Sequence, residues 1–393
     1  MGEGREHLLR IGIAGIGNEG LSIVPFCDAV DGVELTAVAD LRRDALDAFR
    51  GSHPTVQTFE SVEAMCAGGA VDAVWIATPN AAHAENCLAA AGHGVNVILE
   101  KPMAITIEEA DRIVDAVQRS GIRLLLHSHA SDAPIVKMRE IVASGRLGRL
   151  IGIHTMSYKG WLRSPRLAAE LDTARGGGVV FRQGPHQIEI VRRLGGGLVK
   201  SVRAYTGRWH PSFDTEGNYT ALLEFADGTP ATLVFYGYGY FNVTDLTWNV
   251  GESGRRGSGV YRKQTRRTEA LDAPDYYAQG RNEARGDDPS RERAELRQPI
   301  YGLTIVSCKY GEMRQSPDGI YVYTDDGCEE IICPPYLDRA YELQTMRDAL
   351  AEDRSVFPDA PWSRATLEVI LAILQSSREG REIPLRHQVS DHG

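Results

Sequence analysis

The feature that most constrains this chain is a glycine-rich turn directly behind a short apolar run. Residues 9–14 are mainly apolar, and after residues 15–20 a helical pattern continues to Val30. A strand that passes through G-x-G-x-x-G into a helix exposes backbone N–H groups and a helix N-terminus to a pyrophosphate. The pattern predicts a nucleotide-binding turn made of Gly15, Ile16, Gly17, Asn18, Glu19 and Gly20.

The second apolar run favours NAD as the nucleotide. Residues 33–39 predict a buried strand that ends at Asp40, about twenty residues beyond the turn. A carboxylate there can accept both hydrogen bonds of a ribose diol and would repel a 2′-phosphate. Arg42 and Arg43 follow at once. They either neutralise such a phosphate, which would allow NADP, or are solvated residues at the start of the next helix.

Length and charge limit the classes of protein that this chain can belong to. A chain of 393 residues is long for one core and predicts two domains. A net charge of −10 argues against nucleic-acid or anionic-membrane binding. No apolar run is long enough to cross a bilayer, and the first six residues lack the apolar core of a secretion signal. We therefore expect a cytoplasmic protein.

The cysteines and histidines give no sign of a metal site. Six cysteines occur without a C-x-x-C pair, which fits reduced thiols better than disulfides or a zinc site. Eleven histidines show no convincing ligand spacing on a helix. No metal is expected.

The first third of the chain alternates strands and helices. Apolar runs at 55–59, 71–77, 95–99 and 122–126 predict strands, and Thr106 with Glu109 predicts a capping box at the head of a helix that stops at Gly121. This βαβ rhythm predicts an α/β fold with a Rossmann, doubly wound parallel sheet over residues 1–127.

The remainder, 128–393, is expected to form an α+β domain for substrate binding and oligomerisation. Asp132 is predicted to cap a helix that ends at Gly145. An open antiparallel sheet is predicted from strands at 151–158, 199–205, 219–225, 231–236, 242–248, 303–308 and 319–323. Residues 251–297 are polar and predict a loop or lid, and helices are expected at 337–352 and 361–378.

Two residues have the chemistry expected of a dehydrogenation site. Lys101 follows the strand ending at Leu99, at the carboxyl edge where ligands of open α/β sheets bind, and can stabilise a forming alkoxide. His186 follows three glycines, and its imidazole can take a hydroxyl proton near neutral pH. The alternatives are an exposed surface lysine and a structural core histidine.

Further polar and aromatic residues are candidates for substrate binding. Arg182 precedes His186 by four residues and would face the same space on a continuous helix, which Pro185 complicates. His129 follows the last predicted parallel strand, and the loop 158–166 holds Trp161, Arg163 and Arg166. Arginines converging there would favour an anionic or heavily hydroxylated small molecule. The predicted substrate residues are Arg182, His129, Arg163, Gln183 and Trp161.

These pieces together resemble the Gfo/Idh/MocA oxidoreductases over nearly the whole chain. The matching motifs are Gly15-x-Gly17-x-x-Gly20, Ala77-Thr78-Pro79-Asn80-x-x-His83, Glu100-Lys101-Pro102, the glycines at 176–178 and Gly184-x-His186. The resemblance implies that Thr78, Pro79, Asn80, His83, Glu100 and Lys101 contact the cofactor. It also implies that Lys101 and His186 flank the nicotinamide and act on a secondary alcohol, and that the open sheet face forms a homodimer or homotetramer.

One departure from the family pattern concerns the substrate. Arg182 stands where the family usually has Asp, which puts the usual Asp/Lys/His arrangement for sugars and cyclitols in doubt. Residues 127–134 and 181–187 resemble the branch of 4,5-dihydroxyphthalate dehydrogenases, which act on a cis-dihydrodiol with two carboxylates. Arg182 would then bind a carboxylate.

Three functions follow as hypotheses. The first is an NAD-dependent dehydrogenase that oxidises a ring secondary hydroxyl, such as that of the phthalate cis-dihydrodiol. The second is a sugar, glycoside or cyclitol dehydrogenase of the same family. The third is a non-catalytic NAD(P)-sensing protein, against which the presence of both Lys101 and His186 weighs.

Overall fold

The computed structural model describes residues 8–164, 166–257 and 296–391. These residues divide into two compact units. The first comprises 8–127 and 337–364, and the second comprises the remaining described residues. Most of the polar stretch 251–297, predicted to be a loop or lid, lies outside the described residues.

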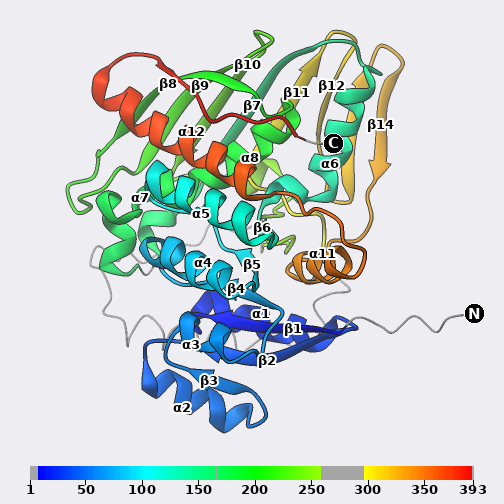
Figure 1. The fold of residues 1–393 in the computed structure, drawn as a ribbon. Coiled ribbons are helices and arrows are strands. Elements are labelled where there is room, and N and C mark those ends of the chain that lie inside the picture. The colour runs from blue at the N-terminus through cyan, green and yellow to red at the C-terminus, as the bar shows by residue number, and fades with distance from the viewer. Residues whose placement is uncertain (1–7, 165, 258–295, 392–393) are drawn as a thin grey trace, which may run out of the picture. The chain divides into compact units, whose positions relative to one another are not determined.

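The first unit is built on a six-stranded sheet in the order β3-β2-β1-β4-β5-β6, with every neighbouring pair parallel (Figure 1). This is the doubly wound order of a Rossmann fold, and it confirms the predicted α/β class. The strands are β1 (Leu9–Ala14), β2 (Val33–Ala39), β3 (Gln57–Phe59), β4 (Ala73–Ile76), β5 (Asn96–Leu99) and β6 (Leu124–Leu126).

The helices of this unit begin and end at residues that the sequence indicates. The Thr106 hydroxyl accepts from the Glu109 N–H, the Glu109 side chain returns to the Thr106 N–H, and Gly121 ends the helix at φ 71°. The helices are α1 (Asn18–Ala29), α2 (Arg43–Ser52), α3 (Val62–Ala67), α4 (His83–Gly92), α5 (Ile107–Ser120) and α11 (Ala340–Ala351).

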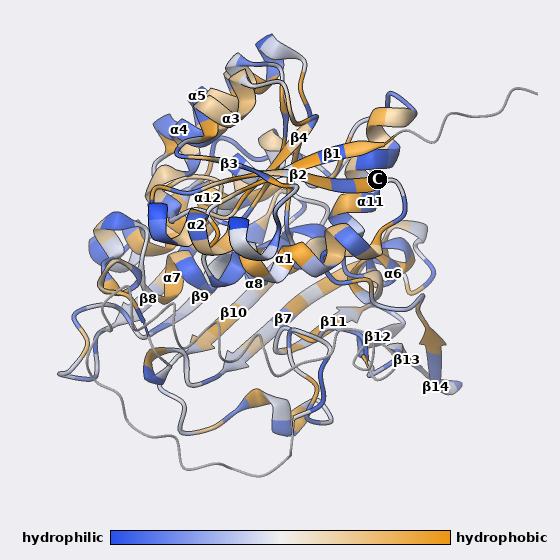
Figure 2. Cartoon of the chain, turned by 90° about the horizontal axis from the view of Figure 1, so that it is seen from below, coloured by the Kyte–Doolittle hydropathy of each residue, from blue (hydrophilic) through white to orange (hydrophobic). Residues whose placement is uncertain are grey.

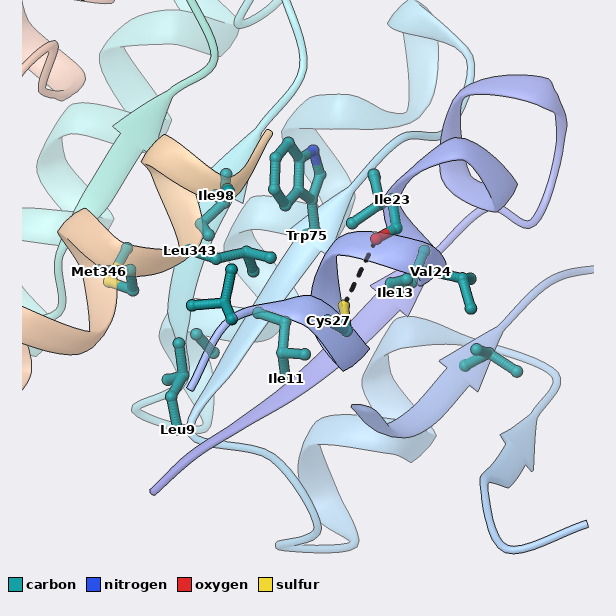
Figure 3. Close-up of a cluster of buried hydrophobic side chains, with 14 of the residues drawn as sticks. Leu9, Ile11, Ile13, Ile23, Val24, Cys27, Trp75, Ile98, Leu343 and Met346 are labelled. Atoms are coloured by element: carbon teal, nitrogen blue, oxygen red, sulfur yellow. Dashed lines mark hydrogen bonds between the residues drawn. The ribbon is translucent and has the colours of Figure 1, made fainter. Parts of the chain in front are cut away.

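A continuous apolar core joins β1 to helices from distant parts of the chain. Ile11 and Ile13 of β1 pack with Cys27 of α1 and with Leu343 and Met346 of α11, all of them buried (Figure 3). Figure 2 shows β1 as a mostly hydrophobic strand, as expected for a strand covered on both faces. The helix α11 therefore completes the core of the nucleotide-binding unit.

The second unit contains a nine-stranded sheet in the order β14-β13-β12-β11-β7-β10-β9-β8-β15. This confirms the predicted antiparallel sheet, with one exception, because β7 and β10 run parallel. The strands are β7 (Leu150–Tyr158), β8 (Val199–Gly207), β9 (Asn218–Phe225), β10 (Pro230–Tyr236), β11 (Leu303–Cys308), β12 (Gly311–Gln315), β13 (Gly319–Thr324), β14 (Gly327–Ile332) and β15 (Ile383–Pro384).

Two local predictions for the second unit are corrected. The expected strand at 242–248 is instead the 3₁₀ helix η6 (Val243–Leu246), because the Asn242 side chain accepts from the Thr244 N–H and begins a turn. Asp132 lies at the N-cap of α6 (Ala133–Ser144) but makes no capping bond, because its carboxylate binds His129. The other helices are α7 (Gly178–Arg182), α8 (Gly184–Leu194) and α12 (Ala360–Glu379).

The two faces of the nine-stranded sheet differ in burial. The helix α8 packs against β7 and β10 and is almost wholly buried. The opposite positions of the central strands carry exposed apolar side chains, with exposed fractions of 54% for Ile151 and 48% for Leu222. An exposed apolar sheet face is typical of an interaction surface.

We expect Thr106→Ala to destabilise the first unit by about 1 kcal/mol, because the N–H of Glu109 loses its side-chain acceptor. Urea unfolding followed by circular dichroism measures this effect. Thr106→Ser keeps the hydroxyl and should remain close to the wild type. Equal urea midpoints for Thr106→Ala and the wild type would show that the capping box does not contribute to stability.

Candidate functional site

The glycine turn is closed so tightly that side chains do not fit at two of its positions. Gly15 has a φ of 86°, and a Cβ there would lie 2.8 Å from the carbonyl oxygen of Ala77. A Cβ at Gly20 would lie 1.9 Å from the carbonyl oxygen of Gly15. Gly17 is the N-cap of α1 and supplies no side-chain cap. The helix N-terminus therefore presents backbone N–H groups without a competing side chain, as phosphate binding requires.

Asp40 stands at the end of β2 and is held beside the turn. Its carboxylate accepts from the N–H of Ile16 at 3.0 Å and from the N–H of Arg42 at 2.9 Å. The Arg42 guanidinium binds both carboxylate oxygens, at 3.1 and 3.0 Å. Arg43 binds Glu60 at 2.9 Å, and both of those side chains are exposed. Both arginines that follow Asp40 therefore have acidic partners in this structure.

The loops after β4 and β5 are tied together by His83. Its Nδ1 lies 2.7 Å from the carbonyl oxygen of Pro102, and its Nε2 lies 2.8 Å from that of Thr78. His83 is fully buried and Asn80 nearly so. The predicted cofactor residues Thr78, Pro79 and Asn80 are thus fixed relative to Pro102.

Glu100 and Lys101 lie at the carboxyl end of β5, above a buried cluster of charges. Burial raises the pKa of Glu100, but the positive charges of His127, Arg339 and Lys101 outweigh it and hold that pKa below its usual value. Burial lowers the pKa of His127, but the nearby charges of Glu342 and Glu100 raise it to about 9. The His127 Nδ1 donates to Glu342 at 2.8 Å. The turn that carries Lys101 is therefore anchored by an ionised carboxylate.

In the second unit, the ring of His186 packs against two other aromatic rings. It occupies the first turn of α8, where Pro185 is tolerated because a first-turn N–H needs no partner. Its ring centroid lies 4.9 Å from that of His129 and 4.6 Å from that of Tyr301. His129 is bound to Asp132 at 2.7 Å. The structure thus brings the predicted residues His186 and His129 together.

Gln183 joins the same cluster through Tyr301. The buried Tyr301 hydroxyl lies 2.9 Å from the Gln183 side-chain oxygen and 3.1 Å from its carbonyl oxygen. Burial, followed by the charge of Glu252, raises the pKa of Tyr301 well above its usual value, so this phenol stays neutral and donates. Sequence reasoning missed Tyr301, because nothing in its neighbourhood marks it as different from other strand-flanking tyrosines.

The three candidate arginines do not share one environment. Arg182 ends α7 and His186 lies in α8, so the two residues are not on one continuous helix. Its Nη2 binds the buried Glu170 at 2.9 Å, and Arg166 approaches the same carboxylate at 3.8 Å. Arg163 instead lies over the ring of Tyr240 at 4.2 Å. Trp161 is buried beneath the Arg166 guanidinium.

Family models match both units of the chain. A model described as an oxidoreductase family with an NAD-binding Rossmann fold matches residues 9–128, and the GFO/IDH/MocA C-terminal domain matches residues 135–250. A 1-carboxy-3-chloro-3,4-dihydroxycyclohexa-1,5-diene dehydrogenase from Comamonas testosteroni is 31% identical over 94% of this chain and 95% of its own length. The chain belongs to the Gfo/Idh/MocA oxidoreductase family.

Solved structures agree with this assignment. A protein from Bordetella bronchiseptica RB50, described as a dehydrogenase, superposes with a TM-score of 0.82 at 30% identity over 96% of this chain and all of that chain. An oxidoreductase from Agrobacterium radiobacter, solved with NAD⁺, L-tartaric acid and magnesium, shares the fold with a TM-score of 0.71 at 18% identity, covering 96% and 98% of the two chains. The chain is an NAD(P)-dependent oxidoreductase of the Gfo/Idh/MocA family.

The residues of the glycine turn fit such a cofactor. The two positions that exclude a Cβ and the N-terminus of α1 form a cradle for a pyrophosphate, and Asp40 lies next to it. Within the described ranges, no cluster of three or more His, Cys, Asp or Glu side chains is placed to hold a metal ion. None of the helices in those ranges combines the length and apolarity needed to span a bilayer.

We expect the stability of the first unit to fall with rising pH because of His127. Its pKa is raised from 6.5 to about 9 by folding, so its stabilising charge is fully present below pH 6.5 and is lost as pH rises through about 9. In the wild type, the free energy of unfolding should be higher at pH 6 than at pH 9.5 by on the order of 3 kcal/mol, and His127→Gln should remove this difference. Urea unfolding at the two pH values measures it. The control is His154→Gln, which changes an exposed histidine on β7. Identical pH profiles for wild type and His127→Gln would contradict the assignment.

Proposed function

We propose that the protein is an NAD-dependent dehydrogenase that oxidises a secondary hydroxyl of a carboxylated cyclic cis-diol. The observation that carries the proposal is the packing of the His186 ring against His129 and Tyr301. The nearly full-length relative from Comamonas testosteroni supports the substrate class, because its name describes a carboxylated cyclohexadiene diol. The phthalate cis-dihydrodiol is the specific substrate that we propose first.

In this proposal His186 holds the proton that leaves the substrate hydroxyl. NAD⁺, when bound, accepts a hydride from the carbon that bears this hydroxyl. A ring nitrogen of His186 takes the proton, and the imidazole becomes positively charged. The neighbouring His129 is held by the carboxylate of Asp132 and packs against the ring of His186.

Lys101 has the complementary role on the substrate oxygen. An ammonium group that donates to this oxygen stabilises the negative charge that develops as the proton leaves. Glu100, directly before it, is an ionised carboxylate among the positive charges of His127 and Arg339. Its negative charge favours the protonated form of Lys101, which is the form that can donate.

The surroundings of Asp40 support NAD over NADP. A 2′-phosphate would meet the carboxylate of Asp40, whereas Arg42 and Arg43 already bind Asp40 and Glu60. Binding of a 2′-phosphate would have to draw an arginine away from an acidic partner.

We expect the purified protein to reduce NAD⁺, and NADP⁺ more slowly, with a carboxylated cis-dihydrodiol. Absorbance at the NADH band measures the rate. His186→Asn should lower kcat by about 10²- to 10⁴-fold and leave NADH binding intact, because the base is lost but the cofactor turn is unchanged. Lys101→Met should lower kcat by about 10²- to 10³-fold.

The matched controls are His154→Asn and Lys200→Met, which change side chains on the nine-stranded sheet that bind Thr232 and Glu224. If the protein oxidises sugars or cyclitols but no carboxylated diol, the proposed substrate class is wrong and the sugar or cyclitol dehydrogenase is favoured. Tight NADH binding without turnover of any of these compounds would favour a sensing role.

The open face of the nine-stranded sheet supports a homodimer or homotetramer. Leu222 on β9 and Ile151 on β7 are about half exposed, as expected for an apolar interaction surface. We expect Leu222→Lys to weaken assembly, because a charge would enter an apolar interface. Light scattering after gel filtration measures the mass, with Thr220→Lys on the same strand face as a milder control. A wild-type protein that is monomeric at micromolar concentration would contradict this prediction.

A further inference from the structure

A lysine that sequence reasoning did not select lies next to the His186 cluster. The Nζ atom of Lys159 lies 4.6 Å from the ring centroid of Tyr301, and the same ring lies 4.6 Å from that of His186. The ammonium and the imidazole are therefore separated by no more than the sum of these two distances. Both groups therefore lie against the ring of the same buried tyrosine.

The backbone holds Lys159 in this position. It directly follows β7, and its N–H donates to the carbonyl oxygen of Tyr236 at the end of β10 at 3.0 Å. The stacked rings of Tyr158 and Tyr236, with centroids 5.0 Å apart, fix the same two strand ends. A cation carried on a rigid strand end can select a substrate by the position of its charge.

The partner of Lys159 can be exchanged at low cost. Its ammonium binds Glu252 at 2.7 Å, and the Glu252 side chain is 50% exposed. The Lys159 side chain is 22% exposed, and the half-exposed carboxylate of Glu252 keeps its access to water when the pair separates. Ion pairs with a solvent-exposed partner contribute little to stability. An incoming carboxylate would replace Glu252 with a group of the same charge and hydrogen-bonding capacity.

The other candidate cation, Arg182, differs in this respect. Its partner Glu170 is only 8% exposed and is also approached by Arg166. If Arg182 bound the substrate instead, the buried carboxylate of Glu170 would lose one of the two cations beside it, which is costly. The exposure of the two acidic partners therefore favours Lys159 as the residue that binds an anionic substrate group.

We propose that Lys159 determines specificity by binding the carboxylate of the substrate in exchange for Glu252, while Arg182 holds Glu170 in place. The proposal rests on the proposed function, because it assumes a carboxylated substrate. It assigns to Lys159 the role that the sequence suggested for Arg182.

The test compares one carboxylated cis-dihydrodiol with the same diol lacking its carboxylate. Lys159→Met should raise KM for the carboxylated diol by about 10- to 100-fold and leave KM for the other diol and both kcat values nearly unchanged. Lys159→Arg should recover most of the loss. Glu252→Gln should lower KM for the carboxylated diol, because the competing carboxylate is removed.

Two controls address folding and the rival cation. Lys137→Met changes another lysine of the second unit, which binds Glu140 on the surface of α6, and should leave both KM values unchanged. The paired variant Arg182→Met with Glu170→Gln avoids an uncompensated buried charge and should affect the two diols equally. A selective rise in KM for the carboxylated diol in this paired variant, with none in Lys159→Met, would overturn the proposal.

The outcomes separate the two proposals. If the wild type oxidises the carboxylated diol and Lys159→Met shifts both KM values equally, the assignment of Lys159 fails and the proposed function stands. If the wild type oxidises only compounds without a carboxylate, both proposals fail.

Discussion

The buried charge cluster beneath Lys101 is the interaction on which the nucleotide-binding unit depends. Glu100 remains ionised although it is buried, because the positive charges of His127 and Arg339 compensate for the water that it has lost. These residues come from the loop after β5, the end of β6 and the segment before α11. The cluster therefore fixes the carboxyl edge of the sheet, and removing any one of its charges would shift the pKa values of the others.

In the second unit, the neutral side chain of Tyr301 has the comparable role of positioning the candidate functional residues. The Tyr301 hydroxyl is satisfied by Gln183, which leaves its ring as an apolar surface in contact with His186 and Lys159. The imidazole and the ammonium thus share one buried ring as a contact surface. In the proposed reaction, one group acts on the hydroxyl that is oxidised and the other binds the carboxylate of the substrate.

Much of the first unit could be predicted from sequence because its signals are local. The glycine turn, the Thr106 capping box and the apolar strands each depend on residues that are close in the chain. Predictions for the second unit were weaker. The residues at 242–248 have strand-like composition, yet the Asn242 side chain starts a turn, and the parallel pairing of β7 with β10 has no signature within either strand.

The sequence by itself determined the family, the nucleotide turn and the identity of Lys101 and His186 as candidates, because these depend on motifs of fixed spacing. Tertiary structure alone decided which side chains surround them. Gln183 and Tyr301 are 118 positions apart, and the pairing of Arg182 with Glu170 depends on how the loop before α7 folds back. The physical reason is that contacts of this kind follow from the order of strands in the sheet and from the burial of individual charges, and neither is encoded in a local pattern.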